Sequence, residues 1–213
     1  GVATVIMMVS FVVGFDRRIA EGFASFGTNL IQFQKFEPRF TGGPPPEEER
    51  NRPNLTLADA EALKRFSRYA AAVSPERYYN AAAKAGSRET NDVTVVGTNA
   101  DFAVANERYV NDGRFLSEAD VRKHARVCVI GTDLVDALFP LQDPMDREVL
   151  VAGRAYRVVG VFEKKGSAFG GSNDNYLAIP ISAFDEQFPE VKYRSGEVLY
   201  ISTVPRSTAV YDA

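Results

Sequence analysis

The sequence is poor in the residues from which catalytic and metal sites are most often built. It holds one cysteine, one histidine and no tryptophan among 213 residues. One cysteine excludes an internal disulfide bond and a cysteine-rich zinc site, because both need further thiols. Any catalytic triad would have to use His124, which has no candidate nucleophile near it in the sequence. We therefore predict no catalytic, cofactor-binding or metal-binding residues, a surface position for His124 at a helix end, and a buried structural thiol at Cys128.

Neither sign of charge is in excess. Lys and Arg number 25 against 28 Asp and Glu, and the formal net charge is −3. A nucleic-acid-binding domain normally carries a clear basic excess, so we predict no nucleic-acid partner. Hydrophobic residues make up 45% of the chain, which is enough for a substantial core in one large or two small domains.

The sequence also lacks a phosphate-binding loop. Two lysines precede the glycines in Lys164-Lys165-Gly166-Ser167, whereas a P-loop places glycines before its lysine and opens a helix. We therefore predict no ATP-binding module in this chain. A hydrolase that used Ser167 with Lys164 or Lys165 would need a dry pocket that lowers a lysine pKa, and a glycine-rich polar loop is the wrong setting for one.

The glycine-rich loop 166–175 has two further features. Residues 172–175 resemble the start of a calcium loop, but they lack the glycine and the glutamate that complete it, so we predict a solvated turn. Phe169 stands among glycines, where an aromatic side chain is costly unless it packs or meets a partner. We interpret this loop as a hypothetical protein contact surface.

No apolar run is as long as a membrane span. Residues 1–15 carry no charge, whereas a span needs about 20 apolar residues. Three interpretations stay open: the outer end of a truncated transmembrane helix, the apolar part of a signal peptide, and a buried core helix. We favour the first, because the run passes directly into Asp16-Arg17-Arg18 without a cleavage site. Apolar residues then continue at helical spacing, which predicts an amphipathic stalk up to Gly27.

Local signals predict an α+β fold for the rest. Thr56 with Asp59, and Ser117 with Asp120, have the spacing of helix caps. Residues 38–54 hold five prolines and an acidic run, which predicts a mobile loop. Strands are predicted at 29–36, 69–83, 93–97, 127–130, 148–152, 155–163, 176–179 and 197–204. Helices are predicted at 57–67, after 117, at 132–139 and from 205–207 onward, and residues 98–111 are predicted to form a short helix followed by irregular chain. The first two strands and the helix between them form a β-α-β unit, whose crossover is expected to be right-handed. The strands at 148–152 and 155–163 are expected to form a hairpin with its turn at Gly153, and the strand at 93–97 is expected to pair back as a hairpin.

Several motifs in this order resemble a known family. They are FGTNLI at 26–31, LTLADAEAL at 55–63, GRFLSEADVRKHARVCVIGTDLVDALFP from 113, AYRVVGVFEKKGSAFGG at 155–171 and YLAIPIS at 176–182. Together they resemble the extracytoplasmic core domain of MacB-type ABC transporter permeases, a group that includes FtsX-like and lipoprotein-releasing permeases. The resemblance covers nearly the whole chain.

The resemblance implies a domain organisation. Residues 1–27 would be the end of a transmembrane helix and its stalk, and 28–83 the first porter-like β-α-β repeat, with the mobile loop at 38–54. An inserted β-rich, sabre-like subdomain would follow at 84–195, and 196–213 would begin a second porter-like repeat that is truncated. A β-α-β unit without its sister would leave one sheet edge unpaired.

The resemblance also implies a function. It is that of a non-catalytic extracytoplasmic domain that transmits ATP-driven conformational change across the membrane, for export or for extrusion of lipoproteins, peptides or drugs. The implied partners are an ABC ATPase domain or subunit, a second permease copy, in some members a periplasmic adaptor protein, and membrane lipid through residues 1–15. The implied location is the bacterial inner membrane, with residues from about 16 onward on the periplasmic side. The alternative is a free-standing secreted or periplasmic α+β binding module.

Overall fold

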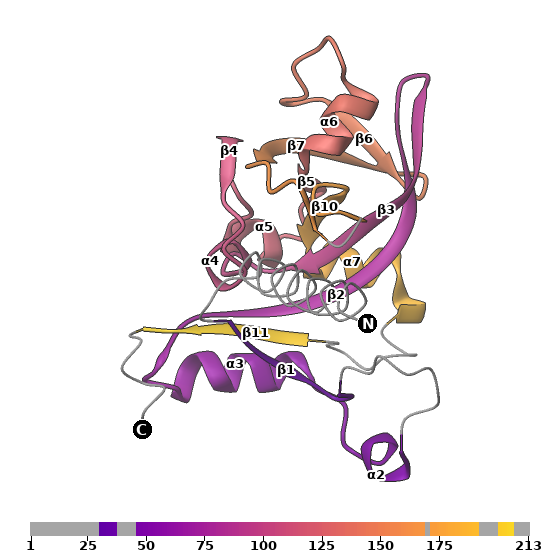
Figure 1. Ribbon diagram of the computed structural model, residues 1–213. Coiled ribbons are helices and arrows are strands. Elements are labelled where there is room, and N and C mark those ends of the chain that lie inside the picture. The colour runs from indigo at the N-terminus through magenta and orange to yellow at the C-terminus, as the bar shows by residue number, and fades with distance from the viewer. Residues whose placement is uncertain (1–29, 38–45, 169–170, 192–199, 207–213) are drawn as a thin grey trace, which may run out of the picture.

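The computed structural model describes residues 30–37, 46–168, 171–191 and 200–206 (Figure 1). The predicted span at 1–15, the stalk up to Gly27 and the hypothesis for Phe169 fall outside the described residues. The strands are β1 (Ile31–Gln34), β2 (Ala70–Ala85), β3 (Arg88–Thr98), β4 (Val110–Gly113), β5 (Val127–Ile130), β6 (Glu148–Val151), β7 (Arg154–Phe162), β8 (Ser167–Ala168), β9 (Gly171–Ser172), β10 (Tyr176–Pro180) and β11 (Tyr200–Pro205). The helices are α2 (Glu47–Arg50), α3 (Leu57–Phe66), α4 (Phe102–Ala105), α5 (Glu118–Arg122), α6 (Thr132–Leu138) and α7 (Ile181–Gln187).

The lower layer in Figure 1 consists of β1, β11 and β2, with α3 against them. β11 lies between the other two strands and is antiparallel to both, so β1 and β2 run parallel and α3 connects them. This confirms the predicted β-α-β unit. Thr56 and Asp59 form the capping box that begins α3. The helix buries Ala60 against Val73 and Ile201, which form a small core of their own.

The upper part in Figure 1 is a closed ring of strands. β2 pairs with β3, and the sheet continues through β10, β5 and β7; β6 then pairs with both β7 and β2 and closes the ring. The ring contains parallel as well as antiparallel neighbours, because β10 is parallel to β3 and β5 is parallel to β7. Closure pairs each of these strands on both sides for part of its length and gives the ring an inside, which side chains fill.

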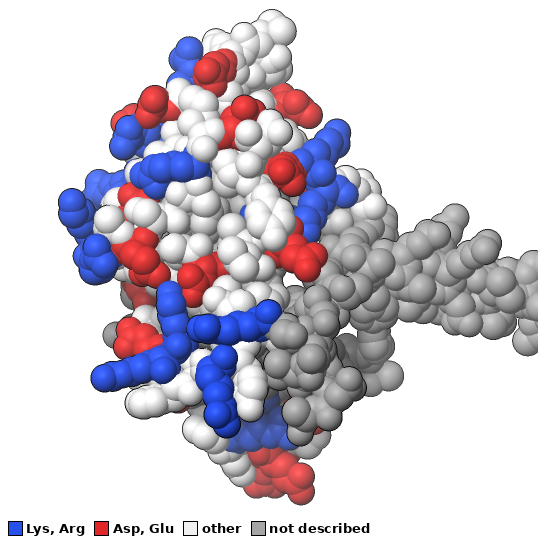
Figure 2. All heavy atoms as spheres, turned by 90° about the vertical axis from the view of Figure 1, so that its left-hand side faces the viewer, with Lys and Arg blue, Asp and Glu red and all other residues white. Residues whose placement is uncertain are grey.

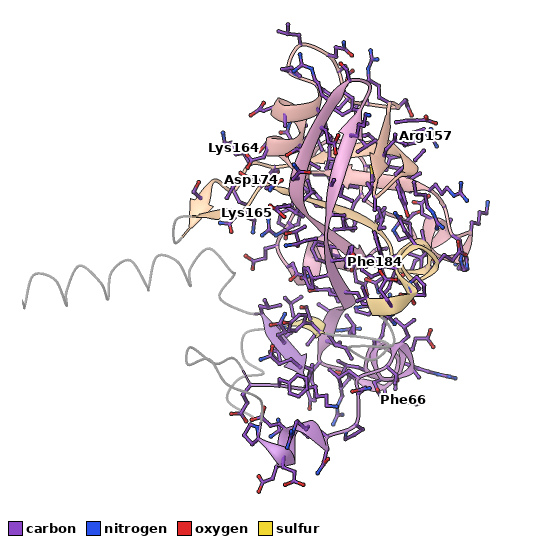
Figure 3. The ribbon with its side chains drawn as sticks, turned by 90° about the vertical axis from the view of Figure 1, so that its right-hand side faces the viewer. Phe66, Arg157, Lys164, Lys165, Asp174 and Phe184 are labelled. Carbon is purple, nitrogen blue, oxygen red and sulfur yellow. The ribbon has the colours of Figure 1, made fainter. Side chains whose placement is uncertain are left out.

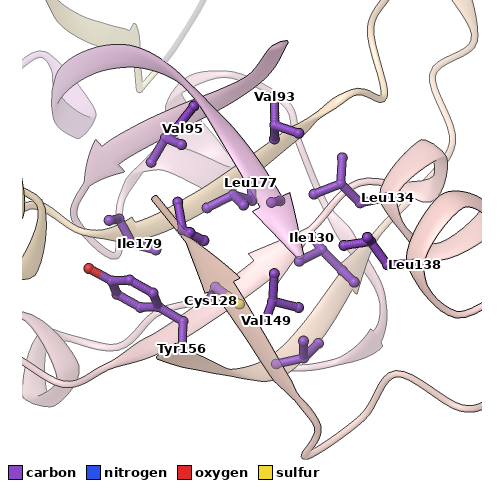
Figure 4. Packing of buried hydrophobic residues seen from close by; sticks show 14 of the residues in the cluster. Val93, Val95, Cys128, Ile130, Leu134, Leu138, Val149, Tyr156, Leu177 and Ile179 are labelled. Carbon is purple, nitrogen blue, oxygen red and sulfur yellow. The ribbon is translucent and has the colours of Figure 1, made fainter. Parts of the chain in front are cut away.

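The main hydrophobic core fills this ring and the space under α6 and α7 (Figure 4). Val93, Cys128, Ile130, Val149 and Leu177 are fully buried in it. Strand β5 is buried along its whole length, which explains its continuous apolar run. Cys128 is buried, as predicted, and its burial raises the pKa of the thiol to about 12.

The predicted α+β class is confirmed, and so are the β6–β7 hairpin and strand β10. The β2–β3 hairpin is longer than predicted, since β2 runs to Ala85 and β3 starts at Arg88. Gly86 takes a φ of +59° in the turn between them, which a glycine adopts without strain. Among the described residues, no helix is long and apolar enough to cross a bilayer.

Two local predictions were wrong. Part of the loop predicted at 38–54 is helix α2, and Glu49 in it is only 5% exposed; residues 38–45 lie outside the described ranges. The acidic run occupies the first turn of α2, where carboxylates stabilise a helix. The irregular chain predicted before residue 111 ends in β4, which pairs with β7. Pro205 is the last residue of β11, and the chain from 207 onward, where the next helix was predicted, lies outside the described ranges.

Candidate functional site

The junction between the lower layer and the ring is built around one strand. Residues 70–76 of β2 pair with β11, and residues 77–85 of the same strand pair with β3. A strand rises about 3.3 Å per residue, so the 16 residues of β2 extend for roughly 50 Å. Both parts of the fold therefore share a continuous, hydrogen-bonded backbone.

Beyond the point where β3 stops pairing with β2, side chains instead of a strand form hydrogen bonds with the β2 backbone. The Val73 amide donates to a carboxylate oxygen of Asp101 at 3.1 Å, and the Val73 carbonyl accepts from the Asn99 amide nitrogen at 3.0 Å. The Thr98 hydroxyl lies 2.8 Å from that of Ser74 and donates to the Pro75 carbonyl at 3.0 Å. The segment after β3 thus satisfies the backbone of β2 on the edge opposite to β11.

A buried carboxyl group lies on one face of β2 at the junction. Glu76 is fully buried, and it accepts hydrogen bonds from the Tyr78 hydroxyl at 2.6 Å and from the Asn106 amide at 2.5 Å. Burial raises the pKa of Glu76, although hydrogen bonds oppose this effect. Asn106 follows α4, and Tyr78 lies in the ring part of β2. Glu76 therefore connects the lower part of β2 with both of these segments through hydrogen bonds.

A buried cation lies on the opposite face, because adjacent strand residues point to opposite sides. Arg77 is 1% exposed and forms an ion pair of 2.8 Å with Asp185 of α7. Next to it, Gly97 of β3 faces Phe184, and a Cβ atom at Gly97 would lie 2.4 Å from the Phe184 ring. The absence of a side chain at Gly97 therefore lets α7 pack closely on the junction.

A lysine of α3 reaches from the lower layer to the ring side of the junction. The Lys64 ammonium lies 2.8 Å from Asp101 and 3.1 Å from Glu118 at the start of α5. These two hydrogen bonds and charges raise the pKa of Lys64, and Asp101 has the largest effect. Figure 2 shows the face on this side, where acidic and basic side chains are mixed above and several Lys and Arg side chains gather in the lower half.

His124 follows α5, and its side chain is half exposed beside Glu186. This confirms the predicted surface position at a helix end. In the described part of the chain, no three His, Cys, Asp or Glu side chains lie close enough to share a metal ion. Ser167 is exposed on β8, and no hydrogen bond joins its hydroxyl to Lys164 or Lys165 within the described segments.

In the turn at residues 172–175, which was predicted to be solvated, Ser172 is exposed but Asp174 is buried. Asp174 is 1% exposed, and its carboxylate accepts hydrogen bonds from the backbone amides of Lys165 at 2.9 Å and Gly166 at 2.7 Å. Figure 3 shows Lys165 and Asp174 at the base of the β8–β9 hairpin. A buried carboxylate is tolerated here because backbone donors satisfy it.

Sequence reasoning missed the polar residues of the junction. The one available signal was the adjacent pair Glu76-Arg77 inside a strand otherwise rich in alanine and tyrosine. Charged neighbours in such a strand are usually solvated, so the pair by itself did not indicate a buried site.

The fold and the junction define an α+β domain organised around one long shared strand. The sequence model of the MacB-like periplasmic core domain family matches residues 1–210. The chain therefore belongs to the family of MacB-like periplasmic core domains, as its motifs predicted.

Similar full-length proteins are named as exporters. The macrolide export ATP-binding/permease protein MacB of Azoarcus sp. is 26% identical over 210 residues, which are 98% of this chain and 31% of that protein. The pyoverdine export ATP-binding/permease protein PvdT of Pseudomonas savastanoi is 30% identical, over 89% of this chain and 28% of that protein. MacB of Rhodospirillum rubrum is 32% identical, over 85% and 27%. The chain thus spans less than a third of the length of these relatives.

Two solved structures share the fold. The periplasmic region of MacB from Actinobacillus actinomycetemcomitans has a TM-score of 0.68 at 18% identity and covers 89% of this chain and 81% of its own. The extracellular domain of the ABC-type transporter YknZ from Gram-positive bacteria has a TM-score of 0.66 at 20% identity and covers 86% and 87%. These matches support the α+β fold with its β-rich part.

Proposed function

We propose that this chain is the extracytoplasmic part of an export permease and transmits, without chemistry of its own, a movement driven by ATP hydrolysis elsewhere. Its membership in the family and the names of its relatives support this role. The proposed partners are an ABC ATPase domain or subunit, a second permease copy and, in some settings, an adaptor protein. Residues 1–15 would lie in the bacterial inner membrane, and residues from about 16 onward would lie on its periplasmic side.

The observation that carries the proposal is the construction of the junction. β2 is shared by the layer that follows the predicted stalk and by the ring, so a displacement of one part acts on the other through a continuous strand. Asn99 and Asp101 hold the backbone of Val73, and Lys64 adds an ion pair across the same place. A rigid connection of this kind passes motion on, whereas a flexible linker would absorb it.

Asp101→Ala in the full-length protein tests this role. The substitution removes the acceptor of the Val73 amide and the partner of Lys64, so we expect faster hydrogen exchange in peptides that contain Val73. We also expect the transport rate to fall at least about fivefold, because the lost hydrogen bond contributes about 1 kcal/mol. The rate of ATP hydrolysis should stay at about half of its value or higher. Both rates would be measured on the same reconstituted sample.

Two further variants serve as controls. Asp101→Asn keeps an oxygen acceptor for the Val73 amide and should restore most of the transport. Asp136→Ala removes an exposed aspartate of α6 that lies away from the junction, and it should change neither rate. Unchanged transport in a protein whose Val73 exchanges faster would contradict the proposal, and so would a parallel loss of transport and ATP hydrolysis.

A further inference from the structure

A pocket of about 280 Å³ opens beside the junction, between the start of β1 and the segment around β9. Leu30 and Gln32 line it from the lower layer, and the other lining residues come from the ring and from the chain around α4. Its apolar walls are formed by Tyr78, Val96, Phe102 and Tyr176. Such a space accepts the body of a small molecule and would hold an aromatic ring or a short alkyl chain against these side chains.

Two cations line the same pocket. The Arg108 guanidinium lies 4.4 Å from the centre of the Tyr176 ring and donates to the Asn173 carbonyl at 3.0 Å. These contacts fix its position, but neither is to a carboxylate. A guanidinium has five N–H donors, so an oxyanion in the pocket could accept from those that remain.

The second cation is Lys165, which is half-buried at the start of the β8–β9 hairpin (Figure 3). Its ammonium makes no hydrogen bond or ion pair with another residue in the described ranges. Burial lowers the pKa of Lys165, and the charge of Arg108 lowers it further; the charges of Glu107, Glu163 and Asp174 oppose both effects. The Asp174 carboxylate accepts from the backbone amides of Lys165 and Gly166, and no ion pair joins it to the Lys165 ammonium.

We infer that this pocket binds a small amphipathic anion, a carboxylate or a phosphate monoester carried on an aromatic or short alkyl body. Arg108 and Lys165 would hold the charged oxygens, and the Tyr78, Val96, Phe102 and Tyr176 side chains would hold the body. An anion would relieve the repulsion between two like charges in a partly desolvated space. The only charged side chains that line the pocket, among the residues described, are these two cations. The site does not depend on the proposed transmission of movement.

Phenyl phosphate is the probe, titrated calorimetrically into the full-length protein in nanodiscs of zwitterionic lipid at low ionic strength. We expect saturable binding of one molecule per chain. Inorganic phosphate, which lacks the ring, and phenol, which lacks the charge, should each bind at least about tenfold more weakly. A charged hydrogen bond contributes about this much, so Lys165→Met should also weaken phenyl phosphate at least about tenfold.

Lys164→Met is the matched control, because it removes the same charge from the adjacent, exposed residue that does not line the pocket. It should change the affinity less than about twofold. Adding phosphatidic acid, whose headgroup is a phosphate monoester, to the nanodiscs separates two sources of the anion: competition identifies a lipid headgroup, and an unchanged affinity identifies a free anion. The inference is overturned if phenyl phosphate does not saturate, or if the two methionine variants weaken it equally while circular dichroism shows both folded.

Discussion

Two carboxyl groups with little exposure show how neighbours decide the charge of a residue. Glu76 accepts from a hydroxyl and an amide, so burial is the larger effect and its pKa is raised. Burial acts on Asp120 in the same direction, but the Arg114 guanidinium and Ser117 donate to its carboxylate, and they lower the pKa of Asp120 to about 2. Asp120 has a cationic partner and Glu76 accepts only from neutral donors. This difference explains why the two pKa values shift in opposite directions.

The depressed pKa of Asp120 predicts a pH-dependent contribution to stability. The contribution is present above the ordinary value of 3.8 and is lost as the pH falls toward the folded-state value of about 2. We expect Asp120→Asn to lower the free energy of unfolding by about 1 to 2 kcal/mol at pH 7, because a charged hydrogen bond is lost. Urea unfolding at several pH values should show the difference shrinking from pH 4 downward.

Asp136→Asn is the control for this measurement, since Asp136 is exposed on α6. It should leave the free energy of unfolding within about 0.5 kcal/mol of the unsubstituted protein. A cost for Asp120→Asn that stayed constant from pH 7 to pH 2 would show that its carboxylate charge is not responsible.

At the scale of elements, helix α7 is placed by a residue without a side chain. Gly97 lies in β3 opposite Arg77 of β2, and the Phe184 ring occupies the space that a Cβ atom would take. Phe184 is fully buried and also packs on Phe188, with 5.0 Å between their ring centres. The close approach brings Asp185 to Arg77, so the packing and the ion pair depend on the same contact.

We expect Gly97→Ala to lower the free energy of unfolding by about 1 to 3 kcal/mol, because overpacking forces α7 outward. The partner variant is Phe184→Ala, which removes Cγ and Cδ2, two of the three atoms nearest to the new methyl group. Gly97→Ala should cost clearly less in that background, and chemical denaturation of all four proteins measures the coupling. Equal costs in both backgrounds would mean that the strain lies elsewhere.

At the scale of the whole molecule, the two parts share a strand but not a core. Ala60, Val73 and Ile201 pack under α3, whereas the ring has separate clusters around Ile130 and around Val129. Units with separate cores can open separately even when their native positions are rigidly connected. The junction would then transmit small displacements while each part keeps its own stability.

Two core substitutions test this separation by hydrogen exchange. Ile201→Ala should lower the opening free energy of amides in β11 and in residues 70–76 by about 2 to 4 kcal/mol, while amides of β5 and β7 change little. Val149→Ala, in the ring core, should show the reverse pattern with a cost of about 1 to 3 kcal/mol. If either variant shifts every protected amide by the same amount, the molecule opens as one unit.

The sequence alone determined what depends on near neighbours. The capping boxes at Thr56 and Ser117, the apolar strand around Cys128 and the β6–β7 hairpin follow from residues a few positions apart. The family also followed from the sequence, because its motifs lie along nearly the whole chain.

Only the tertiary structure decided the contacts between distant segments. Thr203 of β11 donates to the Ala72 carbonyl across 131 positions, and no local pattern indicates that β11 lies between β1 and β2. The closure of the ring by β6, the burial of Glu76 and Arg77, and the meeting of Arg108 with Lys165 at one pocket are of the same kind. Hydrogen bonds and burial at these places depend on how the whole chain packs, whereas caps and short strands depend on the residues beside them.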